Sequence, residues 1–204
     1  MRNNIVLIGG GGHSLVCYDV ISQNQNFNLF GFVDIRSDVV LKDIGCKYLG
    51  SDDVLDELIK KKVFFLISIG QIKSPNKRIE IYNKVKKMGG NFIVLISKFS
   101  YVSPLASIGE GSIVMNGSVI NAKTRIGKNC IINTNAVVEH EVIIESNVHI
   151  APNATILGKV KIKEGTFVGA GAVIREGLTL EKNSLIPAGK ILMNKNINAI
   201  KSDC

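Results

Sequence analysis

Two adjacent residues in the second half of the chain, His140 and Glu141, are the pair best suited to acid–base chemistry. A carboxylate beside an imidazole can hold one ring nitrogen protonated and leave the other as an acceptor, which raises the basicity of the ring. His149 follows nine residues later and is a second candidate. Two alternatives stay open: His140 as a surface turn residue, and His149 as a structural hydrogen-bonding group. The pair nevertheless predicts a general base with an orienting carboxylate.

A glycine-rich loop near the N-terminus is the second chemical feature. It lies between an apolar strand pattern at 5–8 and an apolar helix pattern at 15–21, and it consists of Gly9, Gly10, Gly11, Gly12, His13 and Ser14. Backbone amides in such a loop can approach a phosphate, and the N-terminus of the following helix adds positive potential. Ser14 stands where the dinucleotide-binding fingerprint has its third glycine, so a plain tight turn is the alternative. The loop predicts a site for a phosphate-bearing ligand.

Two residues accompany this loop. Asp34 ends the next apolar strand, where α/β folds contact a ribose or a base, although it could also be an ordinary strand-end acid. His13 lies at the mouth of the loop, where its ring could bind a ligand or cap the helix. Both residues are therefore candidates for nucleotide contacts.

The elements that position these residues alternate between strand and helix in the first half of the chain. Helix patterns follow the glycine loop, Ser51 as an N-cap, and the Ser74-Pro75 pair. The predicted strands are 5–8, 29–33, 63–69 and 92–96. This alternation predicts a small parallel α/β domain of Rossmann type over residues 1–99.

From residue 100 onward the chain repeats every six residues, a period that no α-helix produces. One aliphatic position recurs fifteen times without a break, at Val102, Ile108, Val114, Ile120, Ile126, Ile132, Val138, Ile144, Ile150, Ile156, Ile162, Val168, Ile174, Leu180 and Ile186. The position four residues later is small or aliphatic at every step except Lys190, so both side chains leave one face of an extended segment. The repeat predicts a parallel β-helix domain over 100–204, with about five coils of three hexapeptides each and a polar C-terminal tail.

Composition limits the possible partners. The chain has 204 residues and no apolar run near the ~18 that a membrane span needs, so we expect a cytoplasmic protein. The net charge of +8 is scattered, which argues against nucleic acid and favours small polyanions such as nucleotide diphosphates or coenzyme A. The four cysteines lack metal-ligand spacing. No zinc site is expected either, because the third histidine, His13, lies in the other domain.

Taken together, several motifs resemble those of a known family. They are Ile8-Gly9-Gly10-Gly11-Gly12-His13-Ser14-Leu15-Val16, Gly31-Phe32-Val33-Asp34, Ser68-Ile69-Gly70, Ile132-Asn133-Thr134 with Val138-Glu139-His140-Glu141, and Gly165-Thr166-Phe167-Val168-Gly169-Ala170-Gly171-Ala172-Val173. The chain resembles the sugar acetyltransferases that join a nucleotide-binding α/β domain to a left-handed β-helix. Members acetylate the 4-amino group of nucleotide-linked amino sugars, as in bacillosamine or perosamine pathways, or O-acetylate sialic acid. The resemblance implies acetyl-CoA as acyl donor and a homotrimer with active sites between subunits.

The resemblance also implies residue roles. His140 would be the general base and Glu141 its orienting carboxylate, in a direct transfer without a cysteine intermediate. Substrate contacts would come from Gly9, Gly11, Gly12, His13, Ser14, Asp34, Gly70 and Asn133. Coenzyme contacts would come from His149, Gly158, Gly169 and Ala170. The backbone amide of Gly158 would lie near the thioester, where a developing oxyanion needs a donor.

Two features depart from the family pattern. Relatives often carry two adjacent acids after the second strand, whereas Ile35 follows Asp34, which leaves the nucleotide base open. The usual Gly-x-Pro-Ala-Lys ending is absent, and a polar tail at 194–204 follows Met193. The adenine of the coenzyme must therefore be held differently.

The function predicted from the sequence is acetyl-CoA-dependent N-acetylation of the 4-amino group of a nucleotide-linked 4-amino-4,6-dideoxy sugar. UDP is the favoured nucleotide, with GDP or dTDP as alternatives. Within the same class, the rival is O-acetylation of sialic acid or a related nonulosonic acid. From a different class, the rival is a non-catalytic scaffold that binds a nucleotide sugar.

Overall fold

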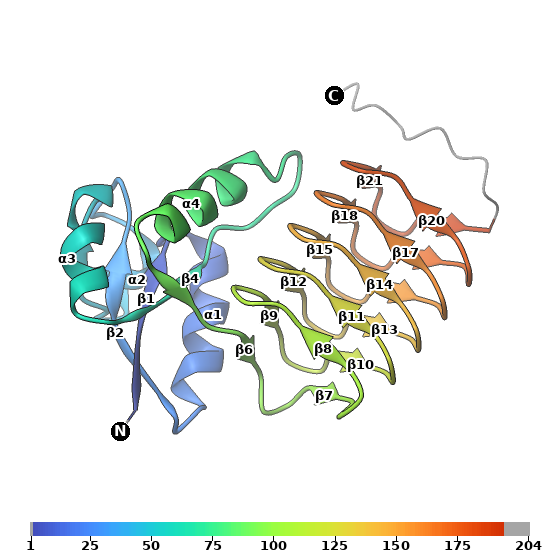
Figure 1. The fold of residues 1–204 in the computed structure, drawn as a ribbon, viewed down its shortest axis with the longest axis horizontal. Coiled ribbons are helices and arrows are strands. Elements are labelled where there is room, and N and C mark those ends of the chain that lie inside the picture. Colours follow the sequence, from blue (N-terminus) through green and yellow to red (C-terminus); the bar gives the residue numbers. More distant parts are fainter. Residues whose placement is uncertain (1, 194–204) are drawn as a thin grey trace.

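The computed structural model of the chain describes residues 2–193 and shows two parts that follow one another in sequence (Figure 1). The N-terminal part contains a five-stranded parallel sheet in the order β3-β2-β1-β4-β5. Its strands are β1 (Asn3–Ile8), β2 (Phe27–Val33), β3 (Tyr48–Gly50), β4 (Phe64–Ile67) and β5 (Asn91–Phe92). Its helices are α1 (Gly12–Ser22), α2 (Val40–Asp43), the 3-10 helix η1 (Asp52–Val54), α3 (Leu55–Lys60) and α4 (Asn76–Lys87). The predicted parallel α/β architecture is confirmed.

Both faces of this sheet are buried, because successive side chains of a strand point to opposite faces. In β1, Ile5 and Leu7 belong to one apolar cluster, to which α1 contributes Val20. Val6 and Ile8 belong to the other cluster, which α3 and α4 cover. The sheet therefore holds the glycine loop, which follows β1 directly, on a rigid support.

The prediction of one strand over 92–96 is wrong, because the chain passes from one sheet to another within this segment. β5 pairs with β4 of the α/β sheet, whereas β6 (Leu95–Ile96) pairs with β9 of the β-helix. The Ile93 amide still donates to Phe65 O, but the Leu95 amide donates to Ser112 O. The α/β sheet thus passes directly into the first coil.

The C-terminal part consists of two-residue strands that recur every six residues. They are β6 (Leu95–Ile96), β7 (Tyr101–Val102), β8 (Ser107–Ile108), β9 (Ile113–Val114), β10 (Val119–Ile120), β11 (Arg125–Ile126), β12 (Ile131–Ile132), β13 (Val137–Val138), β14 (Ile143–Ile144), β15 (His149–Ile150), β16 (Thr155–Ile156), β17 (Lys161–Ile162), β18 (Phe167–Val168), β19 (Val173–Ile174), β20 (Thr179–Leu180), β21 (Leu185–Ile186) and β22 (Ile191–Leu192). Each strand pairs in parallel with the strand three further along, as Val138 does with Ile156. The predicted left-handed β-helix with three hexapeptides per coil is confirmed.

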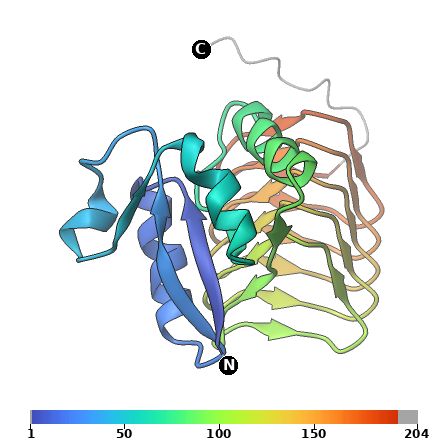
Figure 2. The same ribbon diagram turned by 60° about the vertical axis from the view of Figure 1, so that its left-hand side comes forward.

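The coils form three sheets and three corners, which we name for reference. The junction sheet, β6-β9-β12-β15-β18-β21, lies against the N-terminal part (Figure 2). The second sheet is β7-β10-β13-β16-β19-β22, and the third is β8-β11-β14-β17-β20. The first corner joins the junction and second sheets, the second corner joins the second and third sheets, and the third corner joins the third and junction sheets.

Each turn of the β-helix from Gly111 onward contains one residue in the left-handed conformation, whereas the turns at 97–100 and 103–106 contain none. Gly fills this position in some turns, and eight others hold Lys123, Asn129, Asn135, Glu141, Asn147, Asn153, Lys159 and Asn183, with φ between 55° and 62°. Asn tolerates this conformation better than most side chains. The polar residues of the repeat therefore set the sharp corners, while the aliphatic positions fill a continuous core. Within residues 2–193, no helix is long and apolar enough to span a membrane.

Removing a core side chain should destabilise the β-helix far more than removing an outward one on a neighbouring strand. Ile150 is 0% exposed and Ile143 is 36% exposed. We expect Ile150→Ala to lower the free energy of unfolding by about 2–5 kcal/mol, because it leaves a cavity, and Ile143→Ala to lower it by less than about 1 kcal/mol. Urea unfolding followed by circular dichroism measures both, and equal losses would contradict the inward assignment.

Candidate active site

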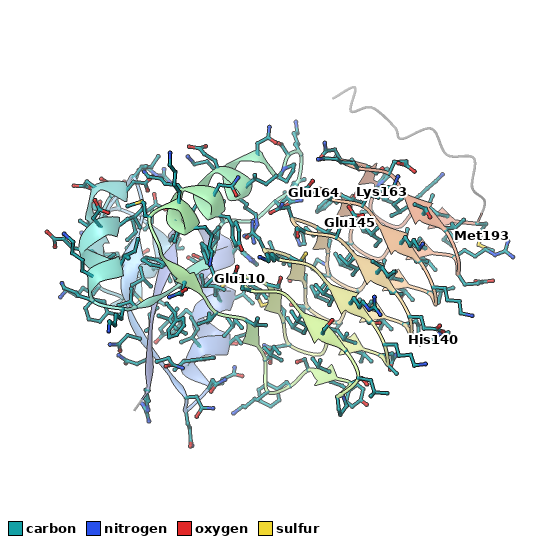
Figure 3. The ribbon with its side chains drawn as sticks, viewed as in Figure 1. Glu110, His140, Glu145, Lys163, Glu164 and Met193 are labelled. Atoms are coloured by element: carbon teal, nitrogen blue, oxygen red, sulfur yellow. The ribbon has the colours of Figure 1, made fainter. Side chains whose placement is uncertain are left out.

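The predicted acid–base pair lies at the second corner, immediately after β13. The Nδ1 atom of His140 is 3.1 Å from Oε2 of Glu141. Glu141 has a left-handed backbone, and its amide is held by Ala122 O, so the carboxylate is brought to the preceding ring. When Nδ1 carries the proton and donates to Glu141, Nε2 is left as an acceptor. The His140 side chain is 55% exposed and lies on the side of the β-helix away from the N-terminal part (Figure 3).

Gly158 lies one coil further along and packs against the His140 ring. A Cβ atom at residue 158 would be 2.8 Å from both Cε1 and Nε2 of the imidazole, so a side chain there would displace the ring. The Gly158 carbonyl accepts a hydrogen bond from Gly177, whereas no backbone carbonyl of residues 2–193 accepts one from the Gly158 amide. The structure thus places an available N–H donor beside the candidate base.

Lys159 is a neighbour of this pair that the sequence reasoning missed. Its Nζ atom is 4.0 Å from Oε2 of Glu141, and both side chains are about half exposed or more. The signal was present in the repeat, since residues one coil apart stack at the same corner. Lys159 adds a positive charge beside the carboxylate that orients His140.

Asn133 and His149 lie together, but away from the second corner. The amide Nδ2 of Asn133 is 3.1 Å from Nε2 of His149, and Nδ1 of His149 is 2.6 Å from the backbone O of Gln71. These contacts fix the tautomer, because Nδ1 donates to Gln71 and Nε2 accepts from Asn133. His149 is 7% exposed, and burial lowers its pKa to about 4. His149 is therefore a neutral link between the β-helix and the loop after β4.

The first corner also contains Gly169 and Ala170, two of the four residues predicted to contact the coenzyme. Gly169 and Ala170 follow β18 of the junction sheet, as Asn133 follows β12. A Cβ atom at Gly169 would be 2.7 Å from Ile186 O, and Ala170 O accepts a hydrogen bond of 2.7 Å from the Gly189 amide. Asn133, Gly169 and Ala170 therefore lie along one edge of the β-helix.

The glycine loop is held at its base and open at its tip. Gly9 has φ of 108°, and a side chain there would clash with Ile69. Gly11 is the N-cap of α1 and Gly12 is its first residue. Space is open beside both, because a Cβ atom at either would meet nothing within 4 Å. The buried Ser14 hydroxyl donates to Gly11 O and so fixes the turn. The open space beside Gly11 and Gly12 at the tip of the loop is what a phosphate site requires.

Asp34 braces the loop from the neighbouring strand. Its Oδ2 atom accepts a hydrogen bond of 2.7 Å from the Gly10 amide, and its Oδ1 accepts one of 3.0 Å from the Arg36 amide. Any contact of Asp34 with a ribose or a base would therefore be made by a carboxylate that is already held in place.

His13 lies against the loop after β4. A Cβ atom at Gly70 would be 3.9 Å from Cβ of His13, which brings these two predicted residues together. The Nε2 atom of His13 is buried and has no hydrogen-bond partner among the described residues. Burial, followed by the charge of Arg78 and the nearness of His149, lowers the pKa of His13 to about 3. The neutral ring has an unused polar atom beside the glycine loop.

The predicted residues thus form three groups. His140, Glu141 and Gly158 lie at the second corner, whereas Asn133, Gly169 and Ala170 lie at the first corner. The second sheet separates the two corners. His149, His13, Asp34, Gly70 and the glycine loop lie on the side of the N-terminal part. Among residues 2–193, no three His, Cys, Asp or Glu side chains lie where they could hold one metal ion.

Known protein families match most of the chain. Residues 4–85 match the PglD N-terminal domain, residues 123–158 match the bacterial transferase hexapeptide (six repeats), and residues 159–193 match the hexapeptide repeat of succinyl-transferase. These matches cover both the glycine loop and the corner that carries His140.

Solved structures share the whole two-part arrangement. PerB from Caulobacter crescentus, in complex with CoA and GDP-perosamine, is 29% identical with a TM-score of 0.85, over 95% of this chain and 90% of that one. The acetyltransferase domain of PglB from Neisseria gonorrhoeae, in complex with acetyl coenzyme A, is 26% identical with a TM-score of 0.84, over 95% and 92%. WeeI from Acinetobacter baumannii, at 20% identity and a TM-score of 0.74 over 95% and 97%, shares the fold.

The fold and the histidine-bearing corner define an acyltransferase of the hexapeptide-repeat class. More narrowly, its N-terminal part matches the PglD N-terminal domain, and the whole chain is similar to a perosamine N-acetyltransferase and to the acetyltransferase domain of PglB.

Acid should destabilise the protein through its buried neutral histidines. The pKa values of His149 and His13 are about 4 and about 3 in the folded state, against about 6.5 when unfolded. Below pH ~6.5 the unfolded chain binds more protons, so stability falls as the pH falls toward 4, by on the order of 3 kcal/mol for each ring. Urea unfolding from pH 7.5 to 4.5 measures this slope, and His149→Gln should reduce it. A wild-type profile that stays flat below pH 6 would contradict the buried neutral state.

Proposed function

We propose that the protein transfers an acetyl group from acetyl-CoA to the 4-amino group of a nucleotide-linked 4-amino-4,6-dideoxy sugar. The observation that carries this proposal is the His140-Glu141 pair with the unpaired Gly158 amide beside it. The relatives support it, since one solved relative holds CoA and GDP-perosamine and another holds acetyl coenzyme A. The sequence favours UDP as the nucleotide, whereas GDP belongs to the Caulobacter protein, so the nucleotide is left to experiment.

In the proposed mechanism, each residue of the second corner has a defined step. Nε2 of His140 takes a proton from the sugar amine as the amine nitrogen bonds to the thioester carbonyl carbon. Glu141 accepts from Nδ1 and stabilises the imidazolium that forms. The Gly158 amide donates to the oxyanion of the tetrahedral intermediate. The C–S bond then breaks and the carbonyl re-forms, and the proton held on Nε2 of His140 passes to the coenzyme sulfur, which leaves as the thiol and restores the neutral imidazole.

The N-terminal part would bind the nucleotide end of the sugar. The open space beside Gly11 and Gly12 and the N-terminus of α1 suit the diphosphate. His13 and the backbone at Gly70 would face the same ligand, with Asp34 toward the nucleobase. At the first corner, Asn133 would lie near the sugar. We further propose that His149, Gly169 and Ala170 contribute to the coenzyme site.

In a single chain, the glycine loop and His140 lie on different sides of the β-helix. We therefore propose a homotrimer with active sites between subunits. The sheet that separates the two corners carries outward apolar side chains suited to such an interface, namely Tyr101, Val119, Val137, Val173 and Ile191. Packing this face against a neighbouring copy would bring the second corner of one subunit to the first corner and glycine loop of the next.

Replacing the base should abolish turnover on an amino sugar. We expect His140→Ala to lower kcat by roughly 10²–10⁴-fold, the usual worth of a general base. The measurement is thiol release from acetyl-CoA with UDP-, GDP- and dTDP-linked 4-amino sugars and with free and CMP-linked sialic acids. Lys60→Ala, an exposed change at the end of α3, serves as the control.

The same assay distinguishes the rivals. Turnover on a sialic acid without turnover on any amino sugar would move the assignment to O-acetylation. Binding of a nucleotide sugar without turnover on any acceptor would favour a scaffold.

Mixed oligomers test whether one site uses two subunits. Gly11→Asp places a carboxylate in the open space at the predicted phosphate loop, so this variant and His140→Ala should each be inactive alone. If the site lies between subunits, co-expressed equal amounts of the two should regain about a quarter of the wild-type rate, because that share of interfaces joins two intact halves. No recovery in a stable mixed oligomer would contradict the shared site.

A further inference from the structure

Arg78 of α4 is a buried cation at the junction between the two parts, and its side chain has only neutral partners. The residue is 1% exposed. Its Nη1 donates to Ile67 O at 2.9 Å and to Ile69 O at 2.7 Å. Its Nη2 donates to Oδ1 and O of Asn129 at 2.6 and 3.1 Å. No carboxylate of residues 2–193 forms an ion pair with it, and its Nε has no partner.

Burying a positive charge without a counter-ion costs free energy. A buried charge normally has a counter-ion, because removing it from water is expensive and neutral carbonyl groups do not cancel its charge. Burial lowers the pKa of Arg78 to about 10, which still leaves the guanidinium protonated at neutral pH. The protein therefore maintains an uncompensated positive charge in its interior.

The segment that Arg78 holds is also the support of the glycine loop. Ser68 Oγ donates to Gly9 O at 2.6 Å, and the Ile69 side chain occupies the space beside Gly9. Gly70, the next residue, touches His13. Only the segment 67–70 therefore separates the guanidinium from the glycine loop, which has open space beside Gly11 and Gly12. At so short a separation inside the protein, solvent and salt screen the charge weakly.

Binding of an anion at the glycine loop also requires a positive charge nearby. Asp34 places a carboxylate on the Gly10 amide, so a negative charge lies next to the proposed phosphate site. The N-terminus of α1 supplies only about half a unit of positive charge in compensation. A full positive charge beneath the loop would offset the carboxylate and favour a dianionic ligand.

We propose that Arg78 is the buried positive charge of the anion site, a positioning residue that attracts the diphosphate of the ligand without touching it. The ligand supplies the counter-charge that the interior lacks. The identification of that ligand as a nucleoside diphosphate rests on the proposed function, whereas the preference for a diphosphate group does not.

The experiment measures Kd by titration calorimetry on the full chain at 0.15 M ionic strength. The probes are UDP, GDP, dTDP and inorganic pyrophosphate. Arg78→Lys keeps the charge, and Arg78→Gln removes it but keeps an amide donor for the carbonyl groups. We expect Arg78→Gln to weaken the tightest-binding probe by about tenfold or more, and Arg78→Lys to stay within about threefold of wild type. Lys77→Gln removes an exposed charge from the adjacent residue and should leave Kd unchanged.

A second variant cancels the charge without removing Arg78. Asn129→Asp places a carboxylate oxygen where Oδ1 already accepts from Nη2, which keeps this hydrogen bond and creates an ion pair. We expect it to weaken the same probe as strongly as Arg78→Gln does, even if Arg78→Gln fails to fold. Asn183→Asp makes the same change at a left-handed position of the third corner remote from Arg78 and serves as its control.

The outcomes separate the two proposals. Wild-type affinity in both Arg78→Gln and Asn129→Asp would overturn the role of the charge. Equal losses in Arg78→Gln and Arg78→Lys with wild-type affinity in Asn129→Asp would show a role in geometry only, which also overturns it. Binding of pyrophosphate but of no nucleoside diphosphate would remove the proposed function, while the pyrophosphate series still decides the role of Arg78. Binding of neither probe class by the wild type would overturn both.

Discussion

The constraint on which the rest of the structure depends is the left-handed residue at each turn of the β-helix from Gly111 onward. It bends the chain every six residues, so that every position recurs at the same corner one coil later. The core follows from this repetition, because the aliphatic positions always point inward. The candidate active site follows from it as well. Glu141 occupies the left-handed position, which brings its carboxylate to His140, and Gly158 lies one coil along, where only the absence of a side chain leaves room for the imidazole.

The second organising feature is the set of buried polar contacts at the junction. His149 and Arg78 bind the backbone at both ends of the short segment after β4, and the Gln71 side chain donates to Asn147 O at 3.0 Å. Each contact joins a β-helix corner or strand to the segment that supports the glycine loop. Buried polar groups that are specifically paired fix one arrangement better than apolar packing does. The junction thus ties the geometry of the nucleotide loop to that of the β-helix.

The sequence predicted the repeat, the inward positions and the pairing of His140 with Glu141, because a period of six and adjacency in sequence are local signals. It also predicted the α/β part, but it joined β5 and β6 into one strand, since apolar residues 92–96 continue across the change of sheet. Arg78 gave no signal, because a single Arg in a Lys-rich helix resembles an exposed residue. A whole sheet separates His140 from Asn133, because consecutive turns of the repeat occupy different corners. The motifs alone do not reveal this separation. The polar tail predicted at 194–204 lies outside the described residues.

The position of the N-terminal part explains why His140, the proposed general base, is exposed in a single chain. The N-terminal part covers the junction sheet and leaves the second sheet, with its outward apolar side chains, facing away. An exposed imidazole at 55% accessibility, with an unpaired amide beside it, is poorly protected from water, and electrostatic stabilisation of an oxyanion is weak in a wet site. A neighbouring copy packed on the second sheet would exclude water from this corner and deliver the nucleotide loop to it. In such an assembly, the junction contacts that hold the glycine loop on one side of the β-helix would also determine which neighbouring subunit's active site the loop joins.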